Sequence, residues 1–567
     1  MLWCTASAPR ILFLNPAIKE SSEPKHVPYG ELLVAACAEE WFHAQTALLD
    51  LNALRSVLRP SEADKELVSA VEEEDWDIIG IGGITTTYNS IKRTLRLIRP
   101  LTDSLIVLGG GGFTAQPFEW MTWLPEVDVG IHGEAVQTIG DVITHSQDLD
   151  FRNVPGLMWR DTSGNLVMNQ ERKMMTNIDD LPLPKFDLAP LDIYFKNSSV
   201  LLSEEAMTAK RRLDYAASIG CSLSCNFCFD LGLTGLRMVG TEAQFPRSHP
   251  RDVPRLNRWR SPEICVKDWK SMRDRYGCDF ISLLDENLMT MNAVYETHDW
   301  IERISELCVR EGLQPRCVRE GVPHNPEICH GLHFGGTSHA SLVTPRALRA
   351  MKQMGFTYLD YGYEHWDDRM LKYVRKGATV KTNVRSLIMT MRHGIRPIPN
   401  NITGMEPEDF ESIRRMMVAW EVLGIVVMPF LFTPYPGSDI WYRNKEKILQ
   451  EYGDNMELFV DTLNDATEPV VSISKNFSLQ DILIYRFHMV RGDKDAIDQF
   501  ENVWRKRHGQ PTRSKTEQTA DWERFRTEVQ SYADEAWSEQ YQSFNMAEPA
   551  YKPEASLSRG GVTTVRS

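Results

Sequence analysis

Short apolar segments alternate with helical stretches through the first 150 residues, and this alternation constrains the fold more than any other feature. Strands that are separated by helices pair in parallel, so residues 1–150 are predicted to form a doubly wound α/β sheet. Ligands of such sheets bind at the carboxyl ends of the strands. The expected strands are 11–15, 46–51, 78–84, 105–108 and 127–131, and the expected helices are 29–42 and 91–98.

A second alternating series covers residues 205–445 and predicts a partial (β/α)6 barrel of the TIM type, with its site at the strand carboxyl ends. Residues 151–204 are irregular and Pro-rich, which is typical of a linker. Residues 446–545 are charged and predicted to form a helical C-terminal domain, and residues 546–567 a flexible tail. The expected barrel strands are 213–217, 280–284, 332–334, 358–362, 396–400 and 425–432.

The net charge of −15 argues against a broad nucleic-acid surface, because phosphate binding needs a basic stripe. The longest apolar run, residues 422–432, contains Pro429 and is too short to span a bilayer. The N-terminus lacks the basic start and unbroken apolar stretch of a signal peptide. We therefore expect a cytoplasmic protein with no membrane span and no nucleic-acid partner.

Three of the 10 cysteines crowd into the segment GCSLSCNFC, directly after an apolar strand. With the CxxxCxxC spacing of Cys221, Cys225 and Cys228, one loop can bind three irons of a cubane cluster and leave the fourth iron open. The alternatives are a zinc knuckle or three unrelated cysteines. Structural zinc wants four protein ligands, and no second CxxC or HxxxH partner stands near this loop. The other cysteines have no metal-binding spacing, so each is expected to be a small buried hydrophobic residue. They are Cys4, Cys37, Cys265, Cys278, Cys308, Cys317 and Cys329.

With Phe227 before the third cysteine, this loop resembles the signature of the radical S-adenosylmethionine (SAM) superfamily. The resemblance implies a 4Fe–4S cluster whose open iron binds the amino and carboxylate groups of SAM. It also implies an external electron donor of the flavodoxin or ferredoxin type. One electron would release a 5′-deoxyadenosyl radical, which abstracts a substrate hydrogen. RWRSPEICV and FTPYPGSDIW follow in the family's order, so the resemblance covers roughly residues 205–442.

Two further strand ends resemble cosubstrate-binding segments of that superfamily. LLDENLMT follows the second expected barrel strand and makes Asp285 and Asn287 cofactor-binding candidates. The segment from YLDYGYE to KGAT resembles a strand that ends in G-x-E and is followed by a KGxT helix end. The resemblance implies that Glu364 forms a hydrogen bond to SAM. The alternative is a carboxylate at a helix N-terminus, which is favourable there without a ligand.

The first domain resembles the flavodoxin-like or Rossmann-like cobalamin-binding domain that precedes many such barrels. PYGELLVAA, GIGGITTTY, VLGGGGFTAQP and VDVGIHGEAVQTI occur in that domain's order. Glycines at strand ends let the backbone approach a large planar ring. The alternative is an ordinary flavodoxin-like domain whose glycines serve turns only. The candidates for cobalamin binding are Thr85, Thr86, Gly109, Gly110, Gly133 and Glu134, and the last two are expected near the nucleotide tail.

The lower axial histidine of many cobalamin proteins, from the motif D-x-H-x-x-G, is missing in this chain. Here the segment reads DLNALR, with Asn52 at the histidine position and Arg55 at the glycine position. Radical enzymes of this type commonly lack that histidine, so the resemblance holds. We expect cobalamin to bind without a protein imidazole below the cobalt.

Together the resemblances imply a cobalamin-dependent radical SAM enzyme, and they favour a class B C-methyltransferase. In that class cobalamin takes a methyl group from one SAM, a second SAM makes the radical, and the substrate radical collects the methyl group. The same cofactors could instead serve oxidative cyclisation, ring contraction or hydroxylation. A non-catalytic binding protein is the third alternative. The expected substrate is a small molecule or a peptide.

Overall fold

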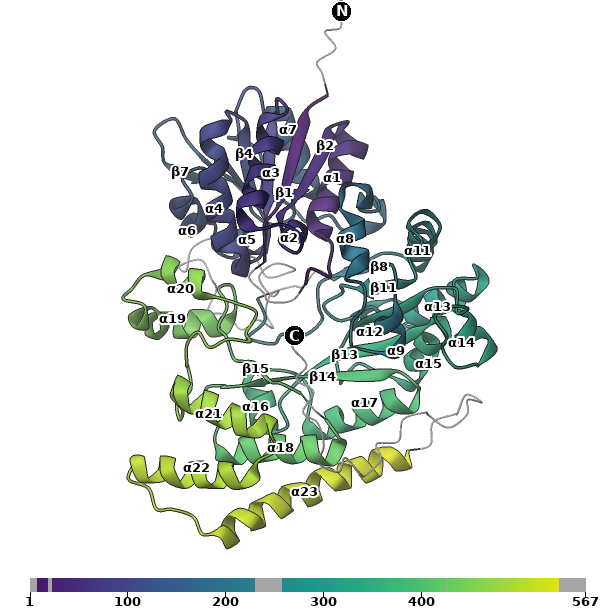
Figure 1. Cartoon of the computed structure of the whole chain (residues 1–567), viewed down its shortest axis with the longest axis vertical. Coiled ribbons are helices and arrows are strands. Elements are labelled where there is room, and N and C mark those ends of the chain that lie inside the picture. Colours follow the sequence, from purple (N-terminus) through teal and green to yellow (C-terminus); the bar gives the residue numbers. More distant parts are fainter. Residues whose placement is uncertain (1–7, 19–22, 230–256, 426, 540–567) are drawn as a thin grey trace, which may run out of the picture.

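Two β-sheets, one above the other in Figure 1, form the framework of the molecule. The computed structural model describes residues 8–18, 23–229, 257–425 and 427–539. The upper sheet belongs to the first domain, and the lower sheet belongs to a half-barrel. Within the described ranges, no helix combines the length and the apolar character needed to cross a bilayer. The expected tail, residues 546–567, lies outside the described residues.

The first sheet has the strand order β2-β1-β3-β4-β5-β6-β7. Neighbouring strands among β1 to β5 are parallel, and their order is the flavodoxin-like order of doubly wound sheets. The fold class predicted for this domain is therefore confirmed. The parallel strands are β1 (Arg10–Asn15), β2 (Gln45–Asp50), β3 (Ile78–Gly82), β4 (Leu105–Gly109) and β5 (Val129–Ile131).

Helices cover both faces of this sheet because successive strand residues point to opposite sides. Ile11 of β1 lies in one core cluster with Ala35, whereas the next residue, Leu12, lies in another with Leu95. These partners come from helices on opposite faces of the sheet. The helices are α1 (Tyr29–Phe42), α2 (Leu51–Leu54), α3 (Pro60–Glu72), α4 (Tyr88–Ile98), α5 (Gly111–Ala115), α6 (Pro117–Trp123) and α7 (Ala135–His145).

The segment expected as a linker, residues 151–204, contains regular structure. β6 (Leu157–Arg160) and β7 (Leu166–Met168) extend the first sheet as antiparallel strands beside β5. They are followed by α8 (Leu191–Lys196), whose Tyr194 hydroxyl donates to Asp50 Oδ2 at 2.6 Å. Strands this short carry little local pattern, and neither the pairing of β6 with β5 nor that of β7 with β6 is visible in the sequence.

The second sheet has the order β15-β14-β13-β12-β11-β8, and every neighbouring pair is parallel. This arrangement confirms the predicted partial (β/α)6 barrel. Its strands are β8 (Arg212–Tyr215), β11 (Phe280–Leu283), β12 (His333–Ser338), β13 (Phe356–Glu364), β14 (Arg396–Thr403) and β15 (Phe430–Leu431). A separate antiparallel pair consists of β9 (Ser218–Ile219) and β10 (Arg258–Trp259).

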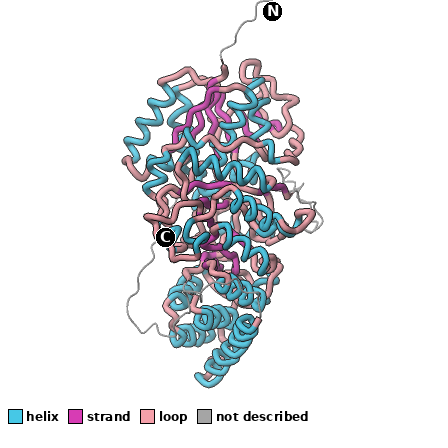
Figure 2. Tube along the Cα trace, turned by 90° about the vertical axis from the view of Figure 1, so that its right-hand side faces the viewer, coloured by secondary structure: helices cyan, strands magenta, loops and turns pink. Residues whose placement is uncertain are grey.

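Helices flank the second sheet, and Figure 2 shows its strands enclosed between them. Trp269 and Trp300, each nearly inaccessible to solvent, belong to the large core cluster beneath these helices. The helices are α9 (Glu204–Thr208), α11 (Pro262–Tyr276), α12 (Met289–Val294), α13 (Trp300–Arg310), α14 (Arg316–Glu320), α15 (Pro345–Met354), α16 (Asp368–Tyr373), α17 (Val380–Arg392) and α18 (Phe410–Leu423).

The last helices confirm the predicted helical C-terminal region, but they serve two different parts of the molecule. α19 (Asp439–Glu451) and α20 (Met456–Thr462) share a core cluster with the first domain. There the rings of Trp441 and Phe459 stack with centroids 4.9 Å apart. The other helices cover α17 and α18 at the opposite end of the molecule (Figure 1). They are α21 (Leu479–Val490), α22 (Lys494–Arg507) and α23 (Lys515–Ser538).

Candidate cofactor site

The CxxxCxxC loop begins directly after β9, beside the carboxyl end of β11. Gly220 takes the left-handed backbone conformation, with φ of 103°, which glycine adopts without a steric cost. Its N–H donates to Glu286 Oε2 at 3.1 Å, and Glu286 lies just beyond β11. Cys225 is buried, whereas Cys221 and Cys228 are half-buried. The loop is therefore tied to the edge of the half-barrel at which a barrel site is expected.

Asn226 anchors the same loop from inside. It is completely buried, and its N–H donates to the Val374 carbonyl at 3.1 Å. Its side-chain amide donates to the Tyr373 carbonyl at 2.7 Å, and its own carbonyl accepts from the Ile440 N–H at 3.1 Å. These contacts join the loop to the end of α16 and to α19. Three thiols on one anchored loop suit a cubane cluster with an open fourth iron, although this assignment stays a prediction.

Phe227, the aromatic residue of the signature, is half-buried. Its ring centroid lies 6.2 Å from that of Phe432, the first residue after β15. Phe227 is thus a packing partner for the last barrel strand. A direct contact between its ring or backbone and a cofactor remains a prediction.

Asp285 and Asn287 follow β11 and lie beside the loop, as their position at a strand end predicts. The Asn287 amide donates to Cys221 Sγ at 4.0 Å. Asp285 is 1% exposed, and its carboxylate accepts from the Ser218 hydroxyl and from the Ala217 N–H. Burial raises the pKa of Asp285 to about 6, against the opposing effect of these donors. Asp285 therefore braces the backbone that leads into the loop, while Asn287 faces its first sulfur.

Glu364 is the last residue of β13 and one of the few residues other than glycine with a positive φ, 59°. The pairing with β14 shifts register between Gly362 and Glu364, which re-aims the strand end. The Glu364 carboxylate accepts from Lys376 Nζ at 2.7 Å. A Cβ atom at Gly362 would lie 2.4 Å from Glu364 Oε1 and 2.8 Å from Lys376 Nζ. The G-x-E pattern therefore has a steric reason: the glycine leaves room for the ion pair.

The helix N-terminus that was the alternative for Glu364 begins later in the chain. α16 starts at Asp368, and the side chain of Asp367 caps it by accepting from the Arg369 N–H. Strained backbone at a buried carboxylate is typical of functional positions. Glu364 is thus a strand-end carboxylate at the edge where the site is expected, and its contact with SAM remains a prediction.

Lys376 connects Glu364 electrostatically with the cysteine loop. Burial alone would lower the pKa of Lys376, but Glu364, Cys225 and Cys221 together raise it. The ammonium group therefore stays charged between a carboxylate and two of the three cysteines. Such a cation offsets part of the negative charge that metal-binding thiolates bring into a buried site.

Glycines at the strand ends of the first sheet fall into two kinds. Gly110 has φ of 92°, and a Cβ atom there would lie 2.4 Å from the Gly83 carbonyl oxygen. Gly110 therefore serves close packing between two strand-end loops. At Gly109 and Gly133, by contrast, an added Cβ would meet nothing within 4 Å. These two positions leave open space next to backbone, as the approach of a large planar ring requires.

The threonines of the GGITTTY segment form a short 3-10 turn after β3. Thr85 is buried, Thr86 is half-buried, and Thr87 donates its hydroxyl hydrogen to the Ile84 carbonyl at 2.7 Å. The turn lies against α20. This strand end is therefore close to the helices that follow the barrel, and its role in cobalamin binding remains a prediction.

Glu134, predicted near the nucleotide tail of cobalamin, joins the two domains in this structure. Its carboxylate pairs with both terminal nitrogens of Arg258, one of them at 2.9 Å. Arg258 is 3% exposed and belongs to β10. Gly133, just before it, donates its N–H to Thr114 Oγ1 at 3.1 Å. Of the two neighbouring residues, Gly133 therefore contacts the first domain, whereas Glu134 contacts β10.

Asn52, at the position of the axial histidine, is 2% exposed and satisfied locally. Its Oδ1 accepts from the Ile18 N–H at 3.2 Å and from Arg55 Nε at 2.7 Å. The side chain therefore holds the β2–α2 connection together. Arg55, which replaces the motif's glycine, is part of that same contact.

Three ionisable residues that lie at these strand ends are absent from the site predicted from the sequence. Lys376 lies in the recognised KGxT segment, but its partner was not assigned. Asp360 precedes Glu364 by four residues on β13, and the two-residue period of a strand could have placed it on the same face as Glu364. Burial and the charge of Glu364 raise the pKa of Asp360 to about 7. Burial also raises the pKa of Glu31 to about 7, and its carboxylate lies next to Gly82 of β3. Only the folded chain reveals the last proximity.

Comparison with known proteins agrees with this geometry. The B12 binding domain family matches residues 16–143, and the Radical SAM superfamily matches residues 215–418. The chain is 22% identical to an uncharacterised methyltransferase, PH0819, of Pyrococcus horikoshii, over 66% of this chain and 71% of that protein. It is 20% identical to an anaerobic magnesium-protoporphyrin IX monomethyl ester cyclase of Synechocystis, over 64% of this chain and 63% of the cyclase.

Among solved structures, the radical SAM methyltransferase TsrM from Kitasatospora setae has a similar fold. The TM-score is 0.57 at 16% sequence identity, and the match covers 78% of this chain and 77% of TsrM. The predicted order of a cobalamin domain before a radical SAM domain is confirmed by the two family matches. This chain therefore contains a B12-binding domain at residues 16–143, followed by a radical SAM domain at residues 215–418.

Proposed function

We propose that the protein is a cobalamin-dependent radical SAM C-methyltransferase that acts on a small molecule or a peptide in the cytoplasm, with an external electron donor. One observation carries the proposal: the anchored three-cysteine loop lies with the Glu364–Lys376 pair in a radical SAM half-barrel that follows a B12-binding domain. Its relative in Pyrococcus horikoshii, named a methyltransferase, and the fold of TsrM support this choice of reaction.

The residues present fit both cofactors. Cys221, Cys225 and Cys228 would hold the cluster, and the open backbone at Gly109 and Gly133 would border the corrin ring. When bound, the cluster supplies the electron that splits SAM, and cobalamin supplies the methyl group. The protein's contribution is to position these groups and to balance their charge.

Three features of the chain would do this positioning. Lys376 holds a positive charge beside Cys221 and Cys225. Glu364 presents a buried carboxylate that can accept hydrogen bonds from the ribose or the ammonium group of SAM. Asp285 and Asn287, at the next strand end but one, stiffen the entry to the loop and restrict movement of its first sulfur.

The experiment that tests the function follows the products of SAM. Anaerobically reconstituted protein is incubated with a strong reductant, methyl-labelled SAM and fractionated cell extract. Methyl transfer through a substrate radical consumes two SAM molecules per turnover, so S-adenosylhomocysteine and 5′-deoxyadenosine should form in about equal amounts, with label in one extract compound. Cys225→Ala should abolish both products, whereas Cys308→Ala, a buried cysteine of α13 outside the loop, should retain them.

A second function uses the same cofactors without methyl transfer, and the similarity to the cyclase of Synechocystis favours it. In that case 5′-deoxyadenosine should form without S-adenosylhomocysteine and without labelled product. Absence of both products with every extract fraction would contradict both functions.

A further inference from the structure

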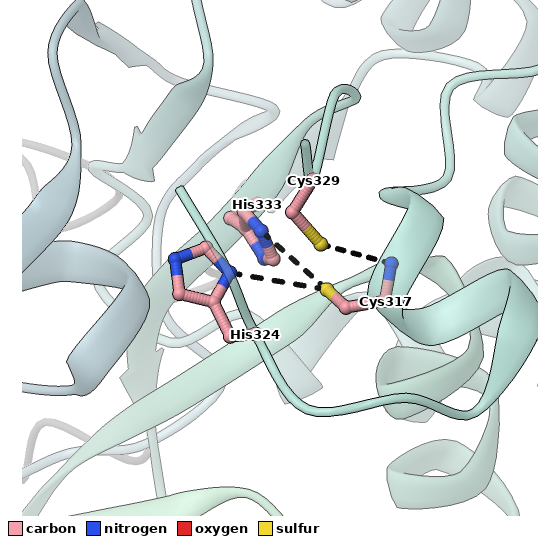
Figure 3. A group of neighbouring side chains, drawn as sticks. All are labelled: Cys317, His324, Cys329 and His333. Carbon is pink, nitrogen blue, oxygen red and sulfur yellow. Dashed lines mark hydrogen bonds between the residues drawn. The ribbon is translucent and has the colours of Figure 1, made fainter. Parts of the chain in front are cut away.

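Four side chains that sequence analysis left out of any site meet at one point of the half-barrel (Figure 3). Cys317 comes from α14, His324 and Cys329 from the connection after it, and His333 is the first residue of β12. The ligand atoms of all four lie within 4.8 Å of one another. Cys317 Sγ is 3.9 Å from His324 Nδ1 and 4.0 Å from His333 Nε2.

These separations suit a single tetrahedral metal ion. Zinc binds sulfur at about 2.3 Å and imidazole nitrogen at about 2.0–2.1 Å, so in a tetrahedron a sulfur and a nitrogen are about 3.6 Å apart. The two sulfur–nitrogen distances from Cys317, 3.9 and 4.0 Å, are slightly longer, and an inward movement of the four side chains would bring their ligand atoms around one ion. Two cysteines and two histidines are also a ligand set of structural zinc.

Neighbouring groups orient these ligands. His324 Nε2 lies 2.9 Å from the hydroxyl of Thr208 in α9, which accounts for one ring nitrogen and leaves Nδ1 toward Cys317. The N–H of Cys317 donates to Cys329 Sγ at 2.9 Å. A partner for the second ring nitrogen is the usual support of a metal-bound histidine. Cys317 and His333 are 7% and 5% exposed, so an ion here would be shielded from water.

The segment that these residues close has little else to fix it. Residues 321–332 contain no helix or strand, and the apolar side chains of Val322 and Ile328 are each 44% exposed. Its two ends are held by backbone hydrogen bonds, among them Leu332 N–H to the Leu313 carbonyl at 2.8 Å. A metal ion would replace the missing hydrophobic contacts of this segment and fasten it to β12.

From these observations we propose that Cys317, His324, Cys329 and His333 bind one zinc ion in a closed, structural site. The cysteines bind as thiolates and release their protons to solvent, so that the ion and its ligands are neutral together. His333 opens β12, whereas the cysteine loop lies at the carboxyl ends of the strands. The zinc site is therefore at the end of the half-barrel that supports stability, away from the proposed chemistry.

The sequence expectation for Cys317 and Cys329 was a small buried hydrophobic residue, and this arrangement differs from it. The spacing C-x6-H-x4-C-x3-H lacks the C-x2-C pair by which zinc sites are usually identified. The ligands come together because the chain turns back between α14 and β12, and that turn is not visible in the sequence.

Metal analysis of the full chain tests the proposal. Protein purified under reducing, anaerobic conditions should contain about one zinc per chain in addition to iron. Cys329→Ser should reduce zinc to below about a tenth of that amount without loss of the loop's iron, whereas Cys308→Ser should retain both. The triple variant C221A, C225A, C228A should show the reverse pattern, with zinc retained and iron lost. Zinc that stays in Cys329→Ser, or leaves with the triple variant, would overturn the assignment.

X-ray absorption at the zinc edge identifies the ligand atoms directly, so this second test does not depend on whether Cys329→Ser folds. In the triple variant, where the cluster loop offers no sulfur, the spectrum should show about two sulfur and two nitrogen ligands at roughly 2.3 and 2.0–2.1 Å. A shell of oxygen and nitrogen only, failure to take up added zinc chloride, or a disulfide between Cys317 and Cys329 in anaerobically prepared protein would each refute the site.

Discussion

At the scale of single residues, Glu364 and Lys376 form a buried pair whose two members have different expected roles. Charge-assisted hydrogen bonds contribute roughly 1.5–3 kcal/mol, and Glu364→Gln keeps the shape but removes the charge. We expect this variant to bind SAM about tenfold more weakly or worse, with the cluster and cobalamin still bound. Equilibrium binding of SAM to reconstituted protein measures the change.

A second variant separates this binding role from a structural one. Glu364→Gln leaves the Lys376 ammonium without its carboxylate and should lower the melting temperature. The double variant Glu364→Gln, Lys376→Met contains neither charge and should regain part of that stability, yet it should still bind SAM weakly. Unchanged affinity in Glu364→Gln together with a lower melting temperature would remove Glu364 from the site.

Asp285 predicts a pH dependence of stability. Burial raises its pKa to about 6, whereas an unfolded aspartate has a pKa of about 3.9. Between pH 4 and 6 the unfolded chain loses this proton before the folded chain does, so the free energy of unfolding falls as pH rises. The loss is nearly complete about one pH unit above 6 and amounts to roughly 2–3 kcal/mol.

The side chain of the variant Asp285→Asn does not titrate. The free energy of unfolding of the cofactor-free variant should therefore lack the fall between pH 4 and 6 that Asp285 causes in the parent chain. Urea denaturation midpoints measured from pH 4.5 to 7.5 should fall less steeply in the variant than in the parent chain. Parallel curves for the two proteins would show that the buried carboxylate does not titrate in this range.

At the scale of elements, local pattern was sufficient where a strand or helix buries a whole face. α1 has the bounds that the pattern predicts, Tyr29–Phe42, and each expected barrel strand overlaps an observed one, although only Phe430–Leu431 of the last, 425–432, is a strand. β6 and β7 escaped prediction because they are short and gain stability only from pairing beside β5. The Cys2His2 group is also not predictable from local pattern. Its ligands come from different elements, and only the path of the chain brings them together.

The cysteine loop could be predicted from the sequence, but the residues that hold it in place could not. The CxxxCxxC spacing is local, so the sequence alone identifies it. Asn226, Glu286 and Lys376 act through contacts with residues more than 60 positions away or with another strand end. Such partners require the register of β11 and β13, which no single segment encodes.

At the scale of the whole molecule, one ion pair lies between the B12-binding domain and the cysteine loop. Glu134 of the first domain binds Arg258, and Arg258 pairs with Ile219 in the two-stranded β9–β10 ribbon. Gly220 and the first cysteine follow Ile219 directly. The pair therefore ties the predicted cobalamin edge to the predicted cluster loop, and a substrate that lies between the two cofactors would have to reach both of them.

Removal of either partner should loosen this connection. The Arg258 side chain is buried, whereas that of Glu134 is 24% exposed. Losing a hydrogen bond to a charged group costs about 1.5–3 kcal/mol, so Arg258→Met and Glu134→Gln should each raise amide hydrogen exchange at β9 and Gly220 by about tenfold. Amide hydrogen exchange in the double variant should be little faster than in either single variant, because each single variant already loses the same contact. Arg275→Met, which breaks an exposed pair with Asp187, is the matched control and should leave this exchange unchanged. If Glu134 instead contacts only the nucleotide tail, Glu134→Gln alone should weaken cobalamin binding, and Arg258→Met should alter neither the affinity nor the exchange.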